Sequence, residues 1–275
     1  MPLITKLPWI GRYAIENERL RSKLTAVRQQ IDELRERDER MARDADLLRQ
    51  AREYEYYWRE AFKRIDIRRL MPFGEVAERV IRDRRTYLDF DRLYTLWQAV
   101  EALPSTARAV AEVGVYRGGS AWFVADALRR RSMEVPFYVC DTFQGHVEVD
   151  EDLDGLHRPG VQFTRVKAEK VAKYLRGFPF VRVEVGDIRE TAPTFAAERG
   201  FGLVHLDVDV YPITRFCLEF FGPRMVSGGV IVADDYGTTT CEGVKKAVDD
   251  FGAANPGFRI FHLLTGQAIV TKLGV

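Results

Sequence analysis

The sequence has few cysteines, no long apolar run and almost no excess of either charge, and each absence excludes a class of protein. Its three cysteines, Cys140, Cys217 and Cys241, are odd in number and show no CxxC or metal-ligand spacing. No apolar stretch approaches the roughly 18 residues that a membrane-spanning helix needs, and residues 1–13 lack the apolar core of a signal peptide. The sequence therefore predicts a soluble, cytoplasmic protein with reduced, mostly buried thiols.

The balance of charge argues against nucleic acid as a partner. The chain has 42 basic and 41 acidic residues and a net charge of +1, whereas proteins that bind nucleic acid through bulk electrostatics are strongly basic. Its 275 residues are enough for one sizeable α/β core and an accessory segment.

The accessory segment is N-terminal, because residues 14–69 contain no glycine or proline. Apolar residues recur there with heptad spacing, which predicts a coiled-coil helix within a separate segment, residues 1–70. The seam consists of Leu20, Leu24, Val27, Ile31, Leu34, Met41, Ala45 and Leu48, and Asp38 interrupts it. We expect homo-oligomerisation through this helix, because so narrow an apolar stripe buries too little to hold an isolated helix in water. Docking to a partner protein, or packing against its own catalytic domain, are the alternatives.

Residues 71–275 show the alternation of strands and helices that is typical of an α/β domain with a mostly parallel sheet. The expected strands are 109–115, 137–140, 181–185, 203–206 and 229–232, and the expected helices are 90–103, 120–130, 214–221 and 242–251. Two further strands, 258–263 and 267–273, flank Thr265-Gly266 and predict an antiparallel hairpin that closes one edge of the sheet.

Two apolar strands end in carboxylates. Asp207 and Asp209 follow the strand at 203–206, and Asp234 and Asp235 follow the next one. Consecutive parallel strands place their carboxyl ends on the same edge of the sheet, where ligands bind. Several carboxylates gathered there repel one another and resist desolvation unless a divalent cation lies among them. The pattern indicates a metal-assisted enzyme, and it leaves open whether Asp209 binds the cation, supports the site or caps the next helix.

A glycine-rich turn follows the first strand, with the sequence E-V-G-V-Y-R-G-G-S at 112–120. Glycines there let the chain turn sharply and let a ligand approach the backbone, and Ser120 is expected to cap the following helix. The spacing is not the G-x-G-x-x-G of dinucleotide-binding proteins. Asp141 ends the next strand, where a carboxylate can accept hydrogen bonds from ribose hydroxyls, and Asp187 ends the third. In strand order, these residues describe a nucleoside-shaped pocket.

An acidic, irregular stretch between Gly145 and Arg176 interrupts the pattern and carries two of the four histidines. A loop of this length in a compact domain is usually functional or disordered. We interpret it as a lid over the substrate site, with His146 and His157 as candidates for proton transfer or substrate orientation. For His157, a plain surface position is an equal alternative. His205, inside an apolar strand, is interpreted as a hydrogen-bonded core residue.

These motifs resemble those of class I S-adenosylmethionine-dependent methyltransferases. More narrowly, they are similar to the macrocin O-methyltransferase (TylF-like) family, which methylates sugar hydroxyls in macrolide biosynthesis. The resemblance rests on the turn at 112–120 and on the segments 141–146, 205–211 and 228–237, and it covers roughly residues 85–273. It implies a Rossmann-like class I methyltransferase fold.

The resemblance also implies two cofactors, S-adenosylmethionine and Mg²⁺. It places Glu112 and Gly114 at the methionine end of the methyl donor, Asp141 at the ribose and Asp187 near the adenine. The full set of cofactor-binding residues that we infer is Glu112, Gly114, Tyr116, Gly118, Ser120, Asp141, Thr142 and Asp187.

For the metal, the resemblance implies Asp207, Asp234 and Asp235 as ligands, with Asp207 also the candidate general base and His146 the alternative base. We expect an O-methyltransferase acting on a hydroxyl of a sugar, a glycosylated natural product or a polysaccharide. The alternatives are a non-catalytic coiled-coil scaffold with a vestigial methyltransferase fold and a metal-dependent hydroxylase. The sequence leaves the acceptor and the methylated hydroxyl open.

Overall fold

The structure is a computed structural model that describes residues 23, 24, 27, 31 and 70–274. The chain divides into two units, Met1–Asp66 and Ile67–Val275, and the fold is that of the second. In the first unit, Leu24, Val27 and Ile31 are helical and expose 53%, 50% and 43% of their surface. The rest of the predicted coiled-coil seam lies outside the described residues, so the coil and the domain boundary at residue 70 stay predictions.

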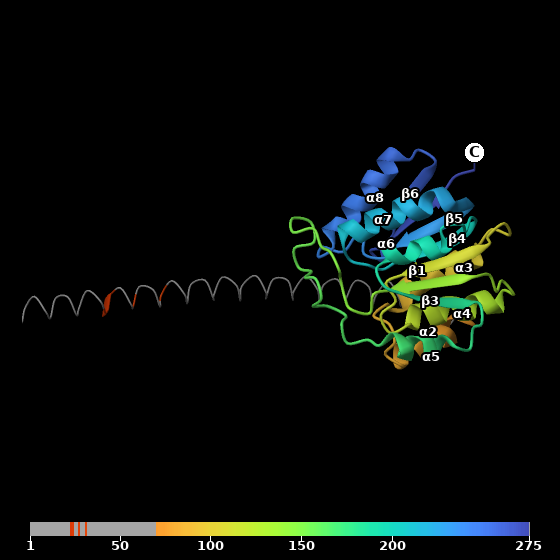
Figure 1. The fold of residues 1–275 in the computed structure, drawn as a ribbon, viewed down its shortest axis with the longest axis horizontal. Helices are drawn as coiled ribbons and strands as arrows, with labels where there is room; N and C mark the ends of the chain where they lie inside the picture. Colours follow the sequence, from red (N-terminus) through yellow and green to blue (C-terminus); the bar gives the residue numbers. More distant parts are fainter. Residues whose placement is uncertain (1–22, 25–26, 28–30, 32–69, 275) are drawn as a thin grey trace, which may run out of the picture. The chain divides into compact units, whose positions relative to one another are not determined.

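Seven strands form one sheet in the order β3-β2-β1-β4-β5-β7-β6 (Figure 1). Strands β1 to β5 run parallel, β7 pairs antiparallel with β5, and β6 pairs antiparallel with β7. The strands are β1 (Ala109–Val113), β2 (Phe137–Asp141), β3 (Val181–Val185), β4 (Phe201–Leu206), β5 (Met225–Ala233), β6 (Phe258–His262) and β7 (Ala268–Lys272). The mostly parallel sheet and the C-terminal hairpin that the sequence predicts are confirmed.

Helices cover both faces of this sheet, because the side chains of a parallel sheet alternate between two apolar layers. In β2, Phe137 and Val139 pack into the core shared with α2 to α5, whereas Tyr138 and Cys140 pack into the core shared with α6 to α8. The helices are α2 (Phe73–Arg82), α3 (Phe90–Glu101), α4 (Gly119–Arg130), α5 (Ala168–Leu175), α6 (Ile188–Thr191), α7 (Tyr211–Phe221) and α8 (Glu242–Ala254), with short 3₁₀ turns η3 (Ala192–Phe195) and η4 (Gly222–Arg224). All three cysteines are free and buried, as predicted.

Two local predictions were wrong. The cap of α4 is Gly118, not Ser120, because Gly118 takes the left-handed conformation (φ 82°) and Ser120 already lies inside the first turn. Helix α5 (Ala168–Leu175) lies within the stretch predicted to be irregular, since its apolar residues are four apart and turn one face toward the core. The irregular connection is therefore shorter, residues 142–167, and we call it the lid loop.

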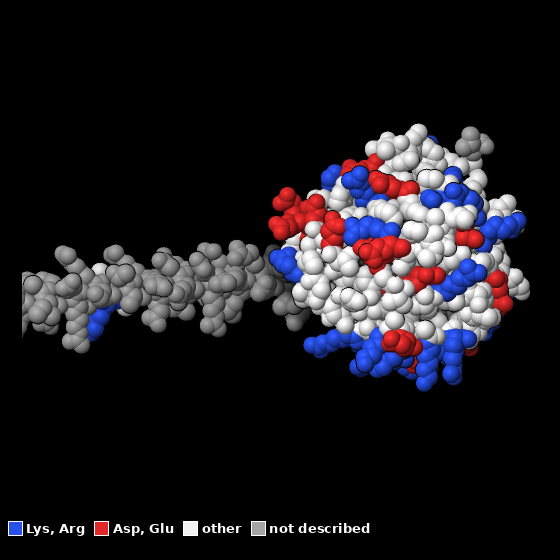
Figure 2. Space-filling view, in the orientation of Figure 1, with Lys and Arg blue, Asp and Glu red and all other residues white. Residues whose placement is uncertain are grey.

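Charged side chains of both signs are spread over the visible face, except along its lower edge, where basic side chains gather beside α2 and α5 (Figure 2). The exposed basic residues of these helices and their flanking loops are Arg79, Arg82, Arg84, Arg165, Lys167, Lys170, Lys173 and Arg176. Among the residues that the structure describes, no helix combines the length and the apolar character needed to cross a membrane.

Candidate active site

A cavity opens at the carboxyl edge of the sheet, lined by residues that follow β1 to β5, by the lid loop and by residues 86–92. The predicted site residues that line it are Gly114, Tyr116, Ser120, Asp141, Thr142, His146, Asp187, Asp207 and Asp235. Three other predicted site residues, Glu112, Gly118 and Asp234, are not among the lining residues, and Glu112 and Asp234 are fully buried. Asp209, whose role the sequence leaves open, also lines the cavity.

The glycine turn brings the end of β1 against the end of β4. Gly114 has a φ of 88°, and a Cβ at this position would lie 1.7 Å from the carbonyl oxygen of Asp207. Only glycine fits here, because any side chain would both strain the backbone and collide with the neighbouring strand. The turn therefore delivers its backbone amides and the Asp207 carboxylate to the same cavity.

Asp141 organises this turn. Its Oδ2 accepts hydrogen bonds from the backbone amides of Val115 (2.7 Å) and Tyr116 (2.9 Å), and its Oδ1 accepts one from Phe143 (2.7 Å). A carboxylate oxygen can accept two hydrogen bonds, so Oδ1 keeps one acceptor position free. Asp141 is thus both a scaffold for the turn and an acceptor for a hydroxyl in the cavity.

Asp187 and Thr142 take part in similar local networks. Asp187 caps α6 by accepting from the amide of Arg189 at 2.9 Å, and it also pairs with the Arg189 side chain at 2.6 Å. Burial opposes ionisation of Asp187, but the hydrogen bonds and charge of Arg189 outweigh it and lower the Asp187 pKa. The hydroxyl of Thr142 donates to the carbonyl of Gly145 at 2.7 Å and so ties the lid loop to the end of β2.

A cluster of aromatic side chains on the cavity wall was not predicted from the sequence. Tyr87 stacks on Tyr116 with ring centroids 4.8 Å apart, and their hydroxyls lie 3.1 Å apart. Phe163, from the lid loop, packs edge-on against Tyr116 at 5.8 Å. These rings come from three distant segments and share no sequence motif, so only the fold reveals that they meet.

The carboxylates that follow β4 and β5 gather beside the cavity. Ligand atoms of Asp207 and Asp234 lie within 4.8 Å of each other, and so do those of Asp209 and Asp235. Burial raises the pKa of Asp207 well above its usual range, and the charges of Asp234 and Asp235 raise it further. Burial, followed in size by the charge of Asp235, also raises the pKa of Asp209. Like charges therefore crowd at this edge of the sheet.

One arginine, which the sequence analysis did not identify, neutralises part of this negative charge. Arg92 of α3 donates from Nη2 to Asp235 Oδ1 at 2.8 Å, and the same nitrogen lies 2.7 Å from Asp234 Oδ2 without hydrogen-bond geometry. Burial alone would lower the Arg92 pKa, but Asp234 and Asp235 reverse that effect and raise it. An arginine within an amphipathic helix carries no signal that it would reach strands more than a hundred residues away.

Behind the cavity, a buried network supports Asp234. The Nδ1 of His205 lies 2.9 Å from Glu112 Oε1, its Nε2 lies 3.5 Å from Asp234 Oδ1, and Gln267 donates to Asp234 Oδ1 at 2.7 Å. Burial alone would lower the His205 pKa, but the two carboxylates raise it to about 10, so His205 is an imidazolium at neutral pH. Glu112 therefore faces His205, and its direct contact with a cofactor stays a prediction.

The site as it stands is short of positive charge. Two cations, Arg92 and His205, face five carboxylates, those of Glu112, Asp207, Asp209, Asp234 and Asp235. Among the described residues, buried Glu112 Oε2 has no hydrogen-bond partner, and Asp234 Oδ2 has only its ion-pair contact with Arg92 Nη2 at 2.7 Å. An orphaned buried acceptor is costly, and oxygen ligands of this kind are those that Mg²⁺ prefers. The donor set thus fits a divalent cation at the ends of β4 and β5.

The chain is similar to known proteins over the region that carries this site. The family described as Macrocin-O-methyltransferase (TylF) matches residues 84–257. A demethyldecarbamoylnovobiocin O-methyltransferase from Streptomyces niveus is 28% identical over 181 residues, or 61% of this chain and 68% of that relative. An 8-demethyl-8-(2,3-dimethoxy-alpha-L-rhamnosyl)-tetracenomycin-C 4'-O-methyltransferase from Streptomyces olivaceus is 29% identical over 179 residues, or 60% of this chain and 67% of that relative.

Solved structures share the fold. The O-methyltransferase NovP matches with a TM-score of 0.60 at 26% identity, covering 70% of this chain and 83% of its own. The calicheamicin methyltransferase CalS11 matches with a TM-score of 0.53 at 20% identity, covering 74% of this chain and 93% of its own. The predicted Rossmann-like methyltransferase fold is confirmed by these matches together with the strand order.

The buried network behind the cavity generates a prediction about stability. Glu112→Gln should destabilise the metal-free protein by about 3 kcal/mol or more, because it leaves the His205 imidazolium with one uncompensated side in a dry interior. Urea unfolding at neutral pH measures this loss. The control Glu219→Gln removes an exposed glutamate that pairs with Arg215 and should cost less than about 1 kcal/mol. Equal effects of the two substitutions would show that the buried pair of Glu112 and His205 contributes no more to stability than an exposed ion pair.

Proposed function

This chain belongs to the macrocin O-methyltransferase (TylF) family, and on that basis we propose that it is a Mg²⁺-dependent enzyme that methylates a sugar hydroxyl with S-adenosylmethionine. The observation that carries the proposal is the meeting of two half-sites in one cavity. A glycine turn with Asp141 forms one side, and Asp207 and Asp235, with the buried Asp234 behind them, form the other. A methyl donor and an activated hydroxyl need such halves side by side.

The half-site on β1 to β3 is proposed to hold the methyl donor. S-adenosylmethionine supplies an electrophilic methyl group on a sulfonium. Asp141 is placed to accept from a ribose hydroxyl through Oδ1, and the aromatic pair Tyr87 and Tyr116 offers a flat apolar wall to a ring. Because Gly114 has no side chain, a ligand can approach its backbone closely. Asp187, lining the same cavity beside β3, is proposed to lie near the adenine.

Mg²⁺ is proposed to bind at Asp207, Asp234 and Asp235. Bound there, the ion lowers the pKa of a hydroxyl and fixes its orientation. Arg92 and the His205 imidazolium then hold Asp235 and Asp234 in place, so that the carboxylates are positioned before a cation arrives. Asp209 lines the same cavity but groups with Asp235 and Cys241, which leaves it beside this set rather than within it.

The proton of the acceptor hydroxyl needs a base, and we propose Asp207. Its carboxylate lines the cavity beside the proposed metal ligands, where an acceptor hydroxyl would lie. His146 is the alternative, but burial and His157 lower its pKa to about 4, which makes it a weak base. If Asp207 is the base, His146→Gln should leave the pH dependence of turnover unchanged. If the substitution instead abolishes the fall in turnover at low pH, His146 is the base.

The acceptor is proposed to be a sugar hydroxyl on a glycosylated natural product or on a polysaccharide. Support comes from the name of the Streptomyces olivaceus relative, which describes methylation at the 4' position of a rhamnosyl compound. A panel of glycosides, nucleotide sugars and polysaccharides, assayed for methyl transfer, tests this class. Transfer confined to aromatic hydroxyls would contradict it.

The two alternatives have weaker support. A hydroxylase of the facial-triad type has no support from the family match, because the family that matches residues 84–257 is described as an O-methyltransferase. A vestigial scaffold has no use for a crowded carboxylate cluster, because each unneeded buried acid lowers stability. The geometry therefore favours the enzyme.

Calorimetry can test the two half-sites separately. We expect S-adenosylmethionine and Mg²⁺ each to bind the wild-type protein, and Asp207→Asn to abolish the Mg²⁺ heat while the methyl donor still binds. The control Asp250→Asn changes an aspartate on α8 whose side chain is 53% exposed, and it should alter neither. No binding of S-adenosylmethionine by the wild type would contradict the proposed function, and unchanged Mg²⁺ binding by Asp207→Asn would contradict the metal assignment.

The raised pKa values of Asp207 and Asp209 predict how pH changes the effect of Mg²⁺. Without metal, the folded protein keeps protons on these groups above 3.8, where the unfolded chain loses them, so its stability falls as pH rises through that window. Mg²⁺ bound at Asp207 displaces its proton, so the gain in melting temperature from Mg²⁺ should increase as pH rises. Asp207→Asn should shrink this increase, while Asp250→Asn leaves it intact. A gain independent of pH would contradict the placement of the ion.

The N-terminal segment is proposed to make the enzyme a homo-oligomer through a coiled coil. Support comes from the heptad spacing and from Leu24, Val27 and Ile31, which are helical and about half exposed in the single chain. Deletion of residues 1–60 should reduce the molar mass measured by light scattering to that of a monomer. The milder substitution of Val27 and Ile31 by lysine should act in the same direction. An oligomer that survives both changes would rule out the seam.

A further inference from the structure

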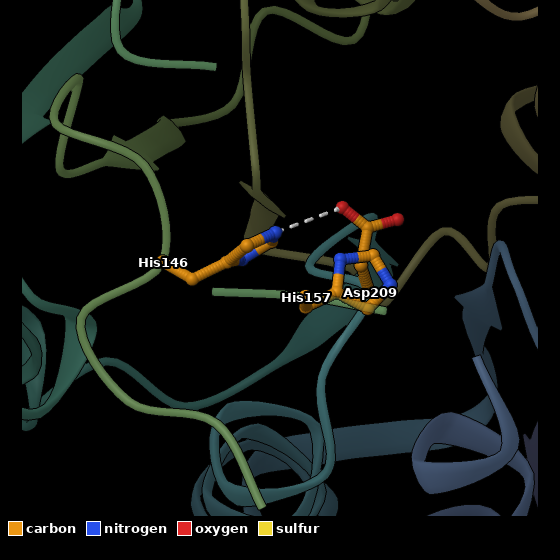
Figure 3. Close-up of side chains that lie close together, drawn as sticks. All are labelled: His146, His157 and Asp209. Carbon is orange, nitrogen blue, oxygen red and sulfur yellow. Dashed lines mark ion pairs between the residues drawn. The ribbon is translucent and has the colours of Figure 1, made fainter. Parts of the chain in front are cut away.

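A second cluster of ligand-type side chains lies beside the carboxylates, between the lid loop and the sheet. His146 and His157 come from the lid loop, Asp209 follows β4, and Cys241 immediately precedes α8. The ligand atoms of the two histidines and Asp209 lie within 4.8 Å of one another (Figure 3). Cys241 Sγ lies 3.6 Å from His157 Nε2 and 4.0 Å from Asp209 Oδ1. Cys241 also belongs to a second group with Asp209 and Asp235, so the two groups overlap at Asp209.

Two nitrogens of this cluster lack a partner. His146 Nε2 and His157 Nδ1 are buried and form no hydrogen bond among the described residues, and the His146 side chain is only 8% exposed. His146 Nε2 points toward Asp209 Oδ2 across 3.7 Å, which is too long for a hydrogen bond (Figure 3). Burial and His157 lower the pKa of His146 to about 4, so at neutral pH the imidazole is uncharged. A buried, neutral nitrogen aimed at a carboxylate is the arrangement in which a metal ion binds between the two.

The spacing fits a tetrahedral transition-metal ion. With metal–ligand bonds of about 2.0–2.3 Å, the edges of such a tetrahedron measure about 3.3–3.8 Å. The distances from His146 Nε2 to Asp209 Oδ2 (3.7 Å) and from His157 Nε2 to Cys241 Sγ (3.6 Å) lie within this range, and that from Cys241 Sγ to the other oxygen of Asp209, Oδ1 (4.0 Å), lies slightly above it. A set of two imidazoles, a carboxylate and a thiol selects Zn²⁺ or Co²⁺ over Mg²⁺, which prefers oxygen ligands alone.

We propose that His146, His157, Asp209 and Cys241 form a second cation site, specific for Zn²⁺ and related ions, that fastens the lid loop to the carboxyl edge of the sheet. Two ligands belong to the loop and two to the core, so an ion between them adds to the contacts that already hold the loop, such as the hydrogen bonds from the Tyr211 amide to Asp154 and the ion pair of Glu148 with Arg189. The site is separate from the one proposed for Mg²⁺, with which it shares no ligand.

The local charge favours this role. Burial, Asp235 and Asp209 raise the pKa of the Cys241 thiol to about 12, because the thiolate would sit in a negative field. The same field attracts a cation, and the bound ion stabilises the thiolate, so binding releases the thiol proton to solvent. Since His146 and Phe163 of the loop line the active-site cavity, an ion that holds the loop also controls access to that cavity.

Cobalt absorption tests the site directly on the full-length protein. We expect stoichiometric Co²⁺, added in the presence of millimolar Mg²⁺, to produce the visible bands of a tetrahedral ion and a thiolate-to-cobalt band in the near ultraviolet. Cys241→Ser should remove the thiolate band, and His157→Gln should weaken Co²⁺ binding by about tenfold or more. The controls Cys217→Ala and His262→Gln change a buried thiol of α7 and a histidine of β6, neither of which belongs to the cluster, and both should leave the spectrum unchanged.

Hydrogen exchange supplies the second measurement. Zn²⁺ should slow exchange of the amides in residues 145–166 of the wild type and have no such effect in His157→Gln. Because it uses a different variant, this measurement still tests the site if Cys241→Ser fails to fold. Absence of the Co²⁺ bands, a thiolate band that persists in Cys241→Ser, or exchange of the loop unaffected by Zn²⁺ would each overturn the proposal. None of these readouts involves methyl donor, acceptor or turnover, so their failure is distinct from failure of the proposed function.

Discussion

The crowding of carboxylates at the ends of β4 and β5 is the constraint on which the rest of the site depends. Buried like charges resist ionisation unless cations or donors reach them. Arg92 comes from α3, His205 from within β4 and Gln267 from the start of β7, and all three converge on Asp234 or Asp235. The placement of α3 and of the C-terminal hairpin is therefore coupled to the charge balance of the active site.

The acids are also tied to the opposite side of the cavity by the backbone. Because Gly114 carries no side chain, the end of β1 can lie against the carbonyl of Asp207. Asp141 then fixes the turn after Gly114 through two backbone amides, Val115 and Tyr116. The proposed donor half of the site and the proposed metal half are thus held at a fixed separation by strands β1 and β4, which are neighbours in the sheet. A rigid spacing of this kind is what transfer between two bound molecules requires.

The site keeps groups that a purely structural core would not tolerate. Asp234 Oδ2, Glu112 Oε2 and His146 Nε2 are buried without hydrogen-bond partners among residues 70–274. Each lowers the stability of the ligand-free protein, and all lie in or beside the cluster of carboxylates and histidines. Their concentration at one edge of the sheet indicates that stability is given up there for binding. The two proposed cation sites divide these groups by chemistry, with oxygen ligands at the strand ends and nitrogen and sulfur ligands beneath the lid loop.

The sequence by itself determined the parallel sheet, its terminal hairpin and the position of Asp207, Asp234 and Asp235, because these follow from local patterns: runs of apolar residues fix the strands, and the residue after a parallel strand lies at the ligand-binding edge. The tertiary structure alone decided what surrounds them. Arg92 meets Asp235 across 143 positions of the chain, and Glu112 meets His205 across 93. Cys241, whose spacing suggested no metal site, meets His157 across 84. Periodicity reports which face of an element is buried, whereas the partner of a buried charge is set by how distant elements pack.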